Sequence, residues 1–308
     1  MYQTLTASTL LIFFLAGSAA AQEKLSLNLR FDKGTVRHVT TTSEQKIDRT
    51  DRDARRQTQQ TVTVGYAIGI DHVDARGAAT VSVKYETVTF KTNGPDGNIL
   101  YDSSSPPGQV PAEVSGLAAL VGNGYTAKLE PEGKVSQISG AKALLDRVLG
   151  QLNLPDATAR SAAEKLVRQE LNESSLKRGL ENLFAPLPDH PVALGDIWKH
   201  SAHTTAGLSI TIDSTYTLKS RQDGVATLSV AANLNTTKDS AIPVTPLTLT
   251  YEFHGTQTGS LDIDESTGWI KRSDLSQTLT GSVTIRGPNT DPQSVPVTIA
   301  TMVKTTVK

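Results

Sequence analysis

Two histidines three residues apart, His200 and His203, are the pair whose spacing most resembles a metal site. On a helix this spacing would place both imidazoles on one face, where they could share a zinc ion with a further ligand. The pair lies in a strand-like run, however, so we expect the two side chains to point to opposite faces of a sheet. No carboxylate stands at a spacing that completes a site, and we nominate no metal-binding residue.

The segment from Asp262 to Gly268 resembles the start of a calcium-binding loop. An EF-hand needs glycine at its sixth position and glutamate at its twelfth, and here these positions hold Thr267 and Ser273. The flanking residues alternate as strands do. We therefore interpret the segment as a polar hairpin turn.

A third candidate lies in residues 48–60, which are charged and polar without periodicity. The cluster contains Arg49, Arg52, Arg55 and Arg56 among Asp48, Asp51 and Asp53. It could form an anion-binding tip of a hairpin or a solvated hairpin end. We favour the solvated end, and the anion-binding tip stays open.

Motifs for nucleophilic or nucleotide chemistry are absent. The sequence has no Gly-x-Ser-x-Gly elbow, no P-loop and no dinucleotide fingerprint. It also has no cysteine, which excludes thiol nucleophiles, disulfides and cysteine zinc sites. A Ser-His-Asp triad assembled only by the fold stays open. We nominate no catalytic or cofactor-binding residue, expect no cofactor, and treat a hydrolase as the minority hypothesis.

Composition favours a β-rich protein that does not bind nucleic acid. The 308 residues include 30 basic and 31 acidic side chains, whereas nucleic-acid binders carry a basic excess. Threonine and serine alternate with valine, leucine and isoleucine, as in antiparallel sheets with one solvated face.

Residues 1–21 are predicted to be a secretory signal peptide. The apolar run Leu10–Leu15 is followed by Ala19 and Ala21 in an Ala-x-Ala pattern, which predicts cleavage after Ala21. The run is far shorter than the ~20 residues needed to span a bilayer. No basic residue precedes it, and an uncleaved anchor is the alternative. We expect a periplasmic or secreted protein without a transmembrane segment in the mature chain.

The first β-rich half covers residues 22–140. Period-two alternation begins at Leu25, and a short helix is predicted at 111–121. A phase break before Val88 predicts a β-bulge near Thr87.

The second β-rich half covers residues 185–308 and alternates in the same way. Pro296 predicts that the last strand, 295–307, lies at an edge. An exposed edge could recruit a protein partner by strand addition.

Residues 141–184 form the long helical segment between the halves. Leu154-Pro155-Asp156 separates its first two helices, and Ser174 or Ser175 is predicted to cap the third. Apolar residues recur at helical spacing and need a sheet or each other to cover them. They include Leu144, Val148, Ala159, Ala162, Leu166, Leu176, Leu180 and Phe184.

The two halves also resemble each other. Three matches occur in the same order, which are Gly34–Val36 with Gly195–Ile197, Gly77–Val83 with Gly224–Val230, and Leu129–Val135 with Leu261–Ile270. This order predicts an internal duplication, with residues 141–184 as a helical insertion.

Two segments, Pro186–Trp198 and Leu129–Gly140, resemble parts of an uncharacterised family of secreted bacterial β-rich proteins with a domain of unknown function. The resemblance covers most of the mature chain and rests on turn residues. It implies export and a β-rich fold, and it supplies no catalytic or binding residues.

These patterns predict a mainly β fold with a central helical insertion and two pseudo-repeated antiparallel curved sheets, half-barrel or sandwich-like. We predict an exported, non-enzymatic protein that binds a ligand or a protein partner in the cell envelope. In its most concrete form it is a carrier that holds a hydrophobic molecule or lipid between the helices and a sheet, by fold-level analogy with envelope lipoprotein carriers.

Overall fold

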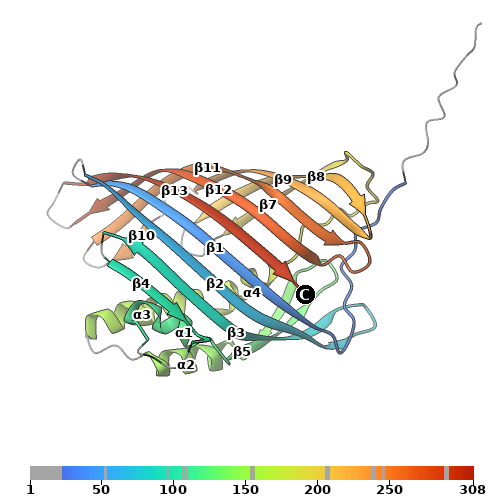
Figure 1. Cartoon of the computed structure of the whole chain (residues 1–308), viewed down its shortest axis with the longest axis horizontal. Coiled ribbons are helices and arrows are strands. Elements are labelled where there is room, and N and C mark those ends of the chain that lie inside the picture. The colour runs from blue at the N-terminus through green and yellow to red at the C-terminus, as the bar shows by residue number, and fades with distance from the viewer. Residues whose placement is uncertain are drawn as a thin grey trace, which may run out of the picture.

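The computed structural model describes most of the chain after the predicted signal peptide. The described residues are 23–51, 54–95, 97–105, 108, 110–152, 157–204, 209–236, 241–244, 247–287 and 291–308. Residues 1–21 lie outside them. In the described part the fold is mainly β, with one sheet of thirteen antiparallel strands and helices on one of its faces (Figure 1). We call the face that carries the helices the inner face.

The strands fall into two groups along the chain. The first group is β1 (Val36–Asp51), β2 (Ala54–Val73), β3 (Ala79–Gly94), β4 (Gly97–Asp102), β5 (Gly124–Leu129) and β6 (Val135–Ser139). The second is β7 (Ile197–Thr204), β8 (Ile210–Gln222), β9 (Val225–Thr236), β10 (Ala241–Val244), β11 (Leu247–Asp264), β12 (Ile270–Arg286) and β13 (Gln293–Val307). The helical elements are the 3₁₀ turn η1 (Ala112–Val114), α1 (Ser115–Ala118), α2 (Ala141–Gln151), α3 (Ala157–Glu170) and α4 (Glu173–Glu181).

The two groups form one sheet, so the expectation of two sheets is wrong. The strand order is β6-β5-β3-β2-β1-β13-β12-β11-β9-β8-β7, with β4 beside β3 and β10 beside β11. The groups join where β1 pairs with β13, from Val39 opposite Val307 to Arg49 opposite Val297, without a register shift. This pairing joins the first and last strands of the chain, and no local sequence pattern reports it.

The last strand is therefore central, and the prediction that residues 295–307 form an edge is wrong. β13 pairs with β1 on one side and with β12 on the other. Pro296 is tolerated because it lies one residue beyond the end of the β1 ladder and is paired only with Ser282 of β12.

The predicted β-bulge is confirmed. Gly65 of β2 stands opposite Thr87 and Tyr66 opposite Tyr85, which leaves Glu86 as the extra residue on β3. The bulge returns Val88 to the inner face, so that both halves of the long strand bury their apolar residues on the same side.

Helices α2 and α4 pack directly on the inner face. Leu144, Val148 and Leu180 are fully buried and share one core with Ile68 and other residues of β2, β3 and β5. Glu181 Oε1 accepts a hydrogen bond of 2.8 Å from the backbone N–H of Val135, which ties α4 to the outermost strand β6.

The cap of α4 differs from the prediction. Asn172, rather than Ser174 or Ser175, is the N-cap, and its Oδ1 accepts a 2.9 Å hydrogen bond from the Ser175 N–H. On α3, the predicted apolar positions Ala159, Ala162 and Leu166 lie outside the side chains that the structure describes.

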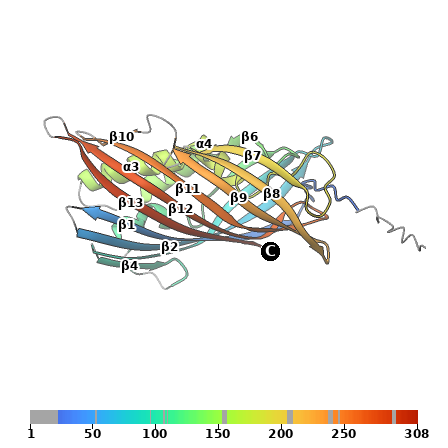
Figure 2. The ribbon, with the colours of Figure 1, turned by 90° about the horizontal axis from the view of Figure 1, so that it is seen from above.

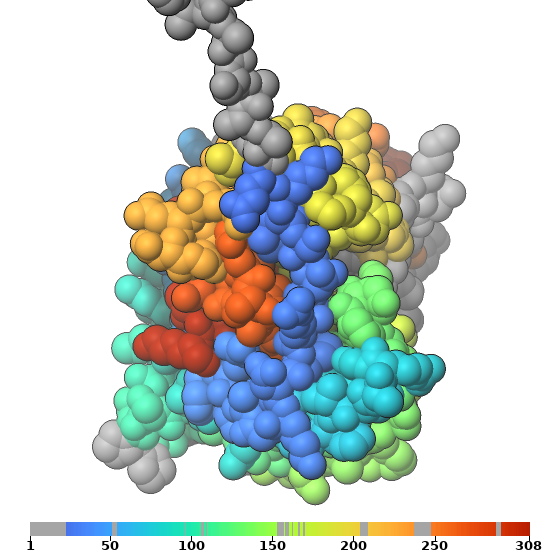
Figure 3. All heavy atoms as spheres, turned by 90° about the vertical axis from the view of Figure 1, so that its right-hand side faces the viewer, coloured from blue at the N-terminus to red at the C-terminus, as the bar shows by residue number. Residues whose placement is uncertain are grey.

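The segment before β1 crosses one end of the curved sheet (Figure 3). Its alternation predicted a strand, and Leu25, Leu27, Leu29 and Phe31 are indeed buried while the residues between them are exposed. It is not a strand of the sheet, however, and forms an isolated bridge between Leu25 and Val192, which lies in the segment between α4 and β7. The segment thus joins two cores, because its first two apolar residues belong to one and its last two to the other.

Glycines on the inner face of β11 and β12 permit the curvature of the sheet (Figure 2). A Cβ atom at Gly255, Gly259 or Gly281 would collide with a backbone carbonyl oxygen of the neighbouring strand. Omitting the side chain lets the two strands approach closely and bend inward.

We predict that Gly259→Ala destabilises the protein by about 1–3 kcal/mol, because the added methyl group must displace the backbone at Asp274. Gly179→Ala is the matched control, since it adds the same group to an exposed helical position with no atom within 4 Å. The control should stabilise by roughly 0.5–1 kcal/mol. Urea unfolding measures both, and an equal effect of the two substitutions would refute the steric explanation of the curvature.

Candidate binding site on the inner face of the sheet

Three apolar clusters line the inner face, and one of them differs in its makeup. Two clusters include residues of the helices, of the segment before β1 or of the segment after α4. The third, which we call the apolar strip, contains only strand residues in the described part of the chain. Its members are Ile210, Ile212, Leu234, Tyr251, Phe253, Leu279, Val283, Val297 and Ile299.

Glycines interrupt the apolar strip at regular places. Gly281 stands opposite Phe253 on one side and Val297 on the other. Gly255 lies in the same way between Leu234 and Leu279. The floor of the strip therefore lacks a side chain at these two points, while apolar groups flank each of them.

A row of polar residues separates the apolar strip from the other two clusters. The polar row crosses the sheet through residues that stand directly opposite one another on successive strands, with Ala232 as its one apolar member. Its residues are His200, Ser214, Ala232, Gln257, Gln277, Thr301, Gln45, Gln60 and Thr92. Gln257 and Thr301 are only 7% and 9% exposed, so this polarity lies inside the fold.

The two central glutamines of the polar row bind each other. Gln277 Nε2 donates a hydrogen bond of 2.6 Å to Gln257 Oε1. Among the described residues, the remaining Gln277 Oε1 and Gln257 Nε2 have no hydrogen-bond partner. One acceptor and one donor thus border the apolar strip, which suits a neutral polar group of a ligand.

The two histidines that suggested a metal pair are on opposite faces, as the strand alternation predicts. His200 faces inward opposite Ser214, and His203 faces outward, where its Nε2 lies 3.3 Å from Ser209 Oγ. Burial, with a smaller contribution from the charge of Lys134, lowers the pKa of His200. No group of three His, Asp or Glu side chains that could hold a metal ion occurs within the described ranges.

The calcium-like segment is a hairpin turn between β11 and β12. Asp264 Oδ1 accepts hydrogen bonds from the backbone N–H groups of Ser266 at 2.9 Å and Thr267 at 3.0 Å. The hydroxyl of Ser266 is the main cause that holds the pKa of Asp264 below its usual range. This carboxylate is therefore engaged in closing the turn.

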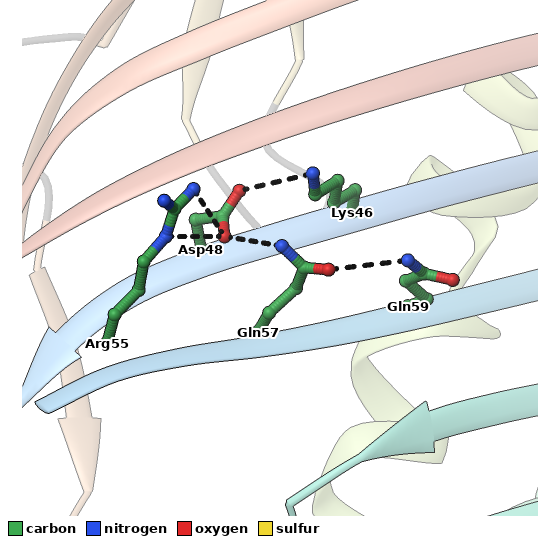
Figure 4. Close-up of polar contacts among 5 residues, drawn as sticks. All are labelled: Lys46, Asp48, Arg55, Gln57 and Gln59. Atoms are coloured by element: carbon green, nitrogen blue, oxygen red, sulfur yellow. Dashed lines mark hydrogen bonds and ion pairs between the residues drawn. The ribbon is translucent and has the colours of Figure 1, made fainter.

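The arginine cluster at the β1–β2 hairpin divides between the two faces. On the outer face, Asp48 Oδ1 accepts hydrogen bonds from Gln57 Nε2 at 2.8 Å and Arg55 Nη2 at 3.2 Å (Figure 4). The bond from Gln57 is the first cause that lowers the pKa of Asp48.

Arg49 and Arg56 of the same hairpin stand opposite each other in the inward register, in line with Val297 of the apolar strip. Arg52 lies outside the described residues. If the register of the hairpin had been known, the alternation of side chains along each strand would have placed Arg49 and Arg56 on one face and Arg55 on the other.

Two surface hollows lie elsewhere. The larger, about 410 Å³, is lined by Glu23, Leu194, Arg221, Gln222, Asp223, Gly224 and Glu265. The smaller, about 260 Å³, is lined by Glu44, Gln45, Lys46, Gln59, Gln60, Thr61, Ser276, Ala300, Thr301 and Met302. Most of the lining residues are polar, and neither hollow includes a residue of the apolar strip, although the smaller one shares Gln45, Gln60 and Thr301 with the polar row.

No helix in the described part of the chain combines the length and the apolar character needed to cross a membrane.

Comparison with known proteins gives a family and a fold likeness. The model of a family of unknown function, DUF6263, matches residues 76–270, which include both segments that carried the resemblance noted from the sequence. No curated protein matches the chain.

A solved structure named "Lipid-protein interactions in lipovitellin" aligns with 91% of this chain at 10% identity and a TM-score of 0.50. The alignment covers 25% of that chain, so this protein spans about a quarter of its length. The OccK11 (OpdR) structure of Pseudomonas aeruginosa aligns with 91% of this chain and 100% of its own at 8% identity, but with a TM-score of only 0.18. Of these two structures, the lipovitellin region has the comparable fold.

The pKa of His200 can be used to test whether this residue lies inward in the polar row, as the structure places it. We predict that Lys134→Gln raises the pKa of His200 but leaves it below the ordinary value, because burial is the larger cause. Lys199→Gln, on the opposite face of β7, should have a smaller effect. NMR titration of the imidazole measures both.

The lowered pKa of His200 also makes the stability of the folded protein depend on pH. The folded state binds the proton of His200 more weakly than the unfolded state, so its contribution to stability is present above pH 6.5 and is lost as the pH falls through the lowered pKa. A His200 pKa at or above the ordinary value would contradict an inward, desolvated position.

Proposed function

The chain belongs to the family of unknown function DUF6263, and we propose that it is a non-enzymatic binding protein that carries a hydrophobic or amphipathic small molecule on the apolar strip. The observation that carries this proposal is the makeup of the strip. Its nine apolar side chains come from five strands and, within the described residues, none comes from a helix. The polar row separates it from the two clusters that hold the fold together.

The contrast with the helical end supports a binding role. At α2 and α4 the helices plug the sheet, since Leu144, Val148 and Leu180 pack against strand residues without exposure. A sheet that only needed a core would continue this packing to its other end. Five members of the strip are at most 9% exposed, and the other four, Ile212, Val283, Val297 and Ile299, are only partly buried.

The chemistry of the site fits an amphipathic ligand. Small-molecule sites are mostly apolar and contain a few polar groups that fix orientation. Here the strip supplies the apolar surface, and Gln257 and Gln277 supply a donor and an acceptor beside it. Burying apolar ligand surface contributes roughly 25 cal/mol per Å², so even one acyl chain would bind measurably.

The fold likeness favours a lipid among hydrophobic ligands. By its name, the lipovitellin structure concerns lipid–protein interactions, and its fold is comparable over 91% of this chain. At 10% identity the likeness supports the class of ligand only through the shared architecture.

Export and internal duplication belong to the same proposal. A carrier in the periplasm or outside the cell would agree with the signal peptide predicted at residues 1–21 and the cleavage predicted after Ala21. The matching segments of the two halves support an origin by duplication, with residues 141–184 as the inserted helices.

The proposal predicts saturable binding of a neutral apolar fluorophore, N-phenyl-1-naphthylamine. Val283→Asp places a charge in the apolar strip and should weaken binding at least about tenfold, because a carboxylate is costly to bury beside an apolar ligand. Thr284→Asp is the matched control, since it places the same charge on the outer face of the same strand and should leave binding unchanged.

Circular dichroism establishes that both variants fold. If Val283→Asp does not fold, Val283→Ala replaces it, with a smaller loss of affinity expected. The proposal is wrong if the unmodified protein shows no saturable binding, or if both variants at position 283 bind the fluorophore as tightly as Thr284→Asp does.

A further inference from the structure

We propose that the molecule carried on the apolar strip is an uncharged lipid with a hydroxyl head group, such as a long-chain alcohol or an acylglycerol, and that Gln257 and Gln277 bind this hydroxyl. The inference rests on the proposed function and adds the chemical class of the head group. Three observations carry it, which are the free hydrogen-bonding groups of the two amides, the absence of charge around them, and an apolar path that leads away from them.

The two glutamines present one free donor and one free acceptor. Their mutual hydrogen bond of 2.6 Å leaves Gln257 Nε2 and Gln277 Oε1 without a partner among the described residues. Reversing both amides would keep the bond and would again leave one donor and one acceptor. The pair therefore presents this combination in either orientation.

The free atoms of the pair can be reached by a ligand. Gln257 is only 7% exposed, so its amide lies inside the fold. Among the described residues, the side-chain atoms that are both buried and unpartnered belong to Arg178 and Thr267. The two glutamine atoms therefore keep some accessible surface.

A hydroxyl group matches the pair because it both donates and accepts hydrogen bonds. It donates to Gln277 Oε1 and accepts from Gln257 Nε2. A carboxylate has only acceptors and would place a second oxygen against Gln277 Oε1, whereas an ammonium group has only donors. The pair thus selects a head group by hydrogen bonding and not by charge.

No charged side chain of the sheet faces inward next to the pair. On β9, β11, β12 and β13, the neighbouring inward positions hold Val230, Ala232, Leu234, Gly255, Gly259, Leu275, Leu279, Ile299, Thr301 and Val303. The charge of Lys134 acts on the row at His200, which is three strands, or ~14 Å, from Gln257. An ionised head group at the pair would lack a counter-charge from the sheet, which is unfavourable.

An apolar path leads from the pair along β12 and β13. From Gln277, the inward positions continue along β12 to Val283, and those of the neighbouring β13 include Ile299 and Val297. These three apolar side chains are only partly buried, so they offer surface to a ligand. The six residues from Gln277 to Val283 span ~20 Å, which accommodates the ~15 Å of an acyl chain in one bilayer leaflet.

The test measures how three probes of equal chain length displace N-phenyl-1-naphthylamine from the purified protein at about pH 8, where carboxylic acids are ionised. The probes are dodecanol, dodecyl methyl ether and laurate. Dodecanol should act at a concentration at least about fivefold lower than the ether, because the ether leaves the acceptor of Gln277 without a donor. Laurate should need at least about tenfold more than dodecanol, because its charge is unpaired at this site.

The double variant Gln257→Met, Gln277→Met replaces both amides by apolar side chains of similar length. Exchanging both partners of a hydrogen bond leaves no unpaired amide, so the variant should fold. It should bind the fluorophore and lose the preference for dodecanol over the ether. Gln60→Met is the matched control, since Gln60 belongs to the polar row but lies three strands from Gln277, and it should keep the preference. Urea unfolding establishes that both variants fold.

The outcomes separate this inference from the proposed function. Equal displacement by dodecanol and the ether, stronger displacement by laurate than by dodecanol, or an undiminished preference in the double variant would overturn the hydroxyl assignment and leave the carrier function in place. If the double variant does not fold, the comparison of the three probes on the unmodified protein decides. Failure of the unmodified protein to bind the fluorophore would overturn the proposed function as well.

Discussion

The packing around Trp269 holds together parts of the chain that are far apart in sequence. Its ring lies 6.1 Å from that of Phe31 and 5.0 Å from that of Phe184, both edge to face. Its Nε1 donates a 3.1 Å hydrogen bond to the carbonyl of Arg30, and the guanidinium of Arg37 lies 4.9 Å from the ring centroid. The turn before β12, the segment before β1, the segment after α4 and β1 itself therefore meet at one side chain.

This contact explains why the two ends of the sheet differ. A curved sheet must cover its inner face, and here the segment from Leu25 to Phe31 and the helices α2 and α4 cover it around Trp269. Beyond the polar row, the apolar strip consists of strand residues only in the described part of the chain. In the proposed function, stability and binding would occupy separate regions of one face, with the partly buried members of the strip nearest to the ligand.

Local patterns in the sequence predicted what depends on neighbours along the chain. Alternation gave the strands and the bulge at Glu86, and helical spacing gave α2 to α4. The pairing of β1 with β13 could not be predicted, because it depends on closing a loop of more than two hundred residues by tertiary packing. For the same reason Pro296 suggested an edge strand, although the ladder to β1 ends just before it.

The candidate site could not be predicted from the sequence either, because it too depends on which strands pair and in which register. Gln45 is far in sequence from Gln257 and Gln277, and the three come into one row only through the register of four strands. The arginines of the β1–β2 hairpin were visible as a cluster, but their division between the two faces follows from a register that the sequence alone does not define.

The central claim is that a ligand lies on the apolar strip and not in the helical core. Methyl NMR of protein labelled at isoleucine, leucine and valine, titrated with hexadecanol, tests it most directly. Chemical shifts of Ile212, Val297 and Ile299 should move in a saturable manner, whereas those of Leu144 and Leu180 should stay in place. Shifts confined to the core methyl groups, or an unchanged spectrum at saturating ligand, would contradict the claim.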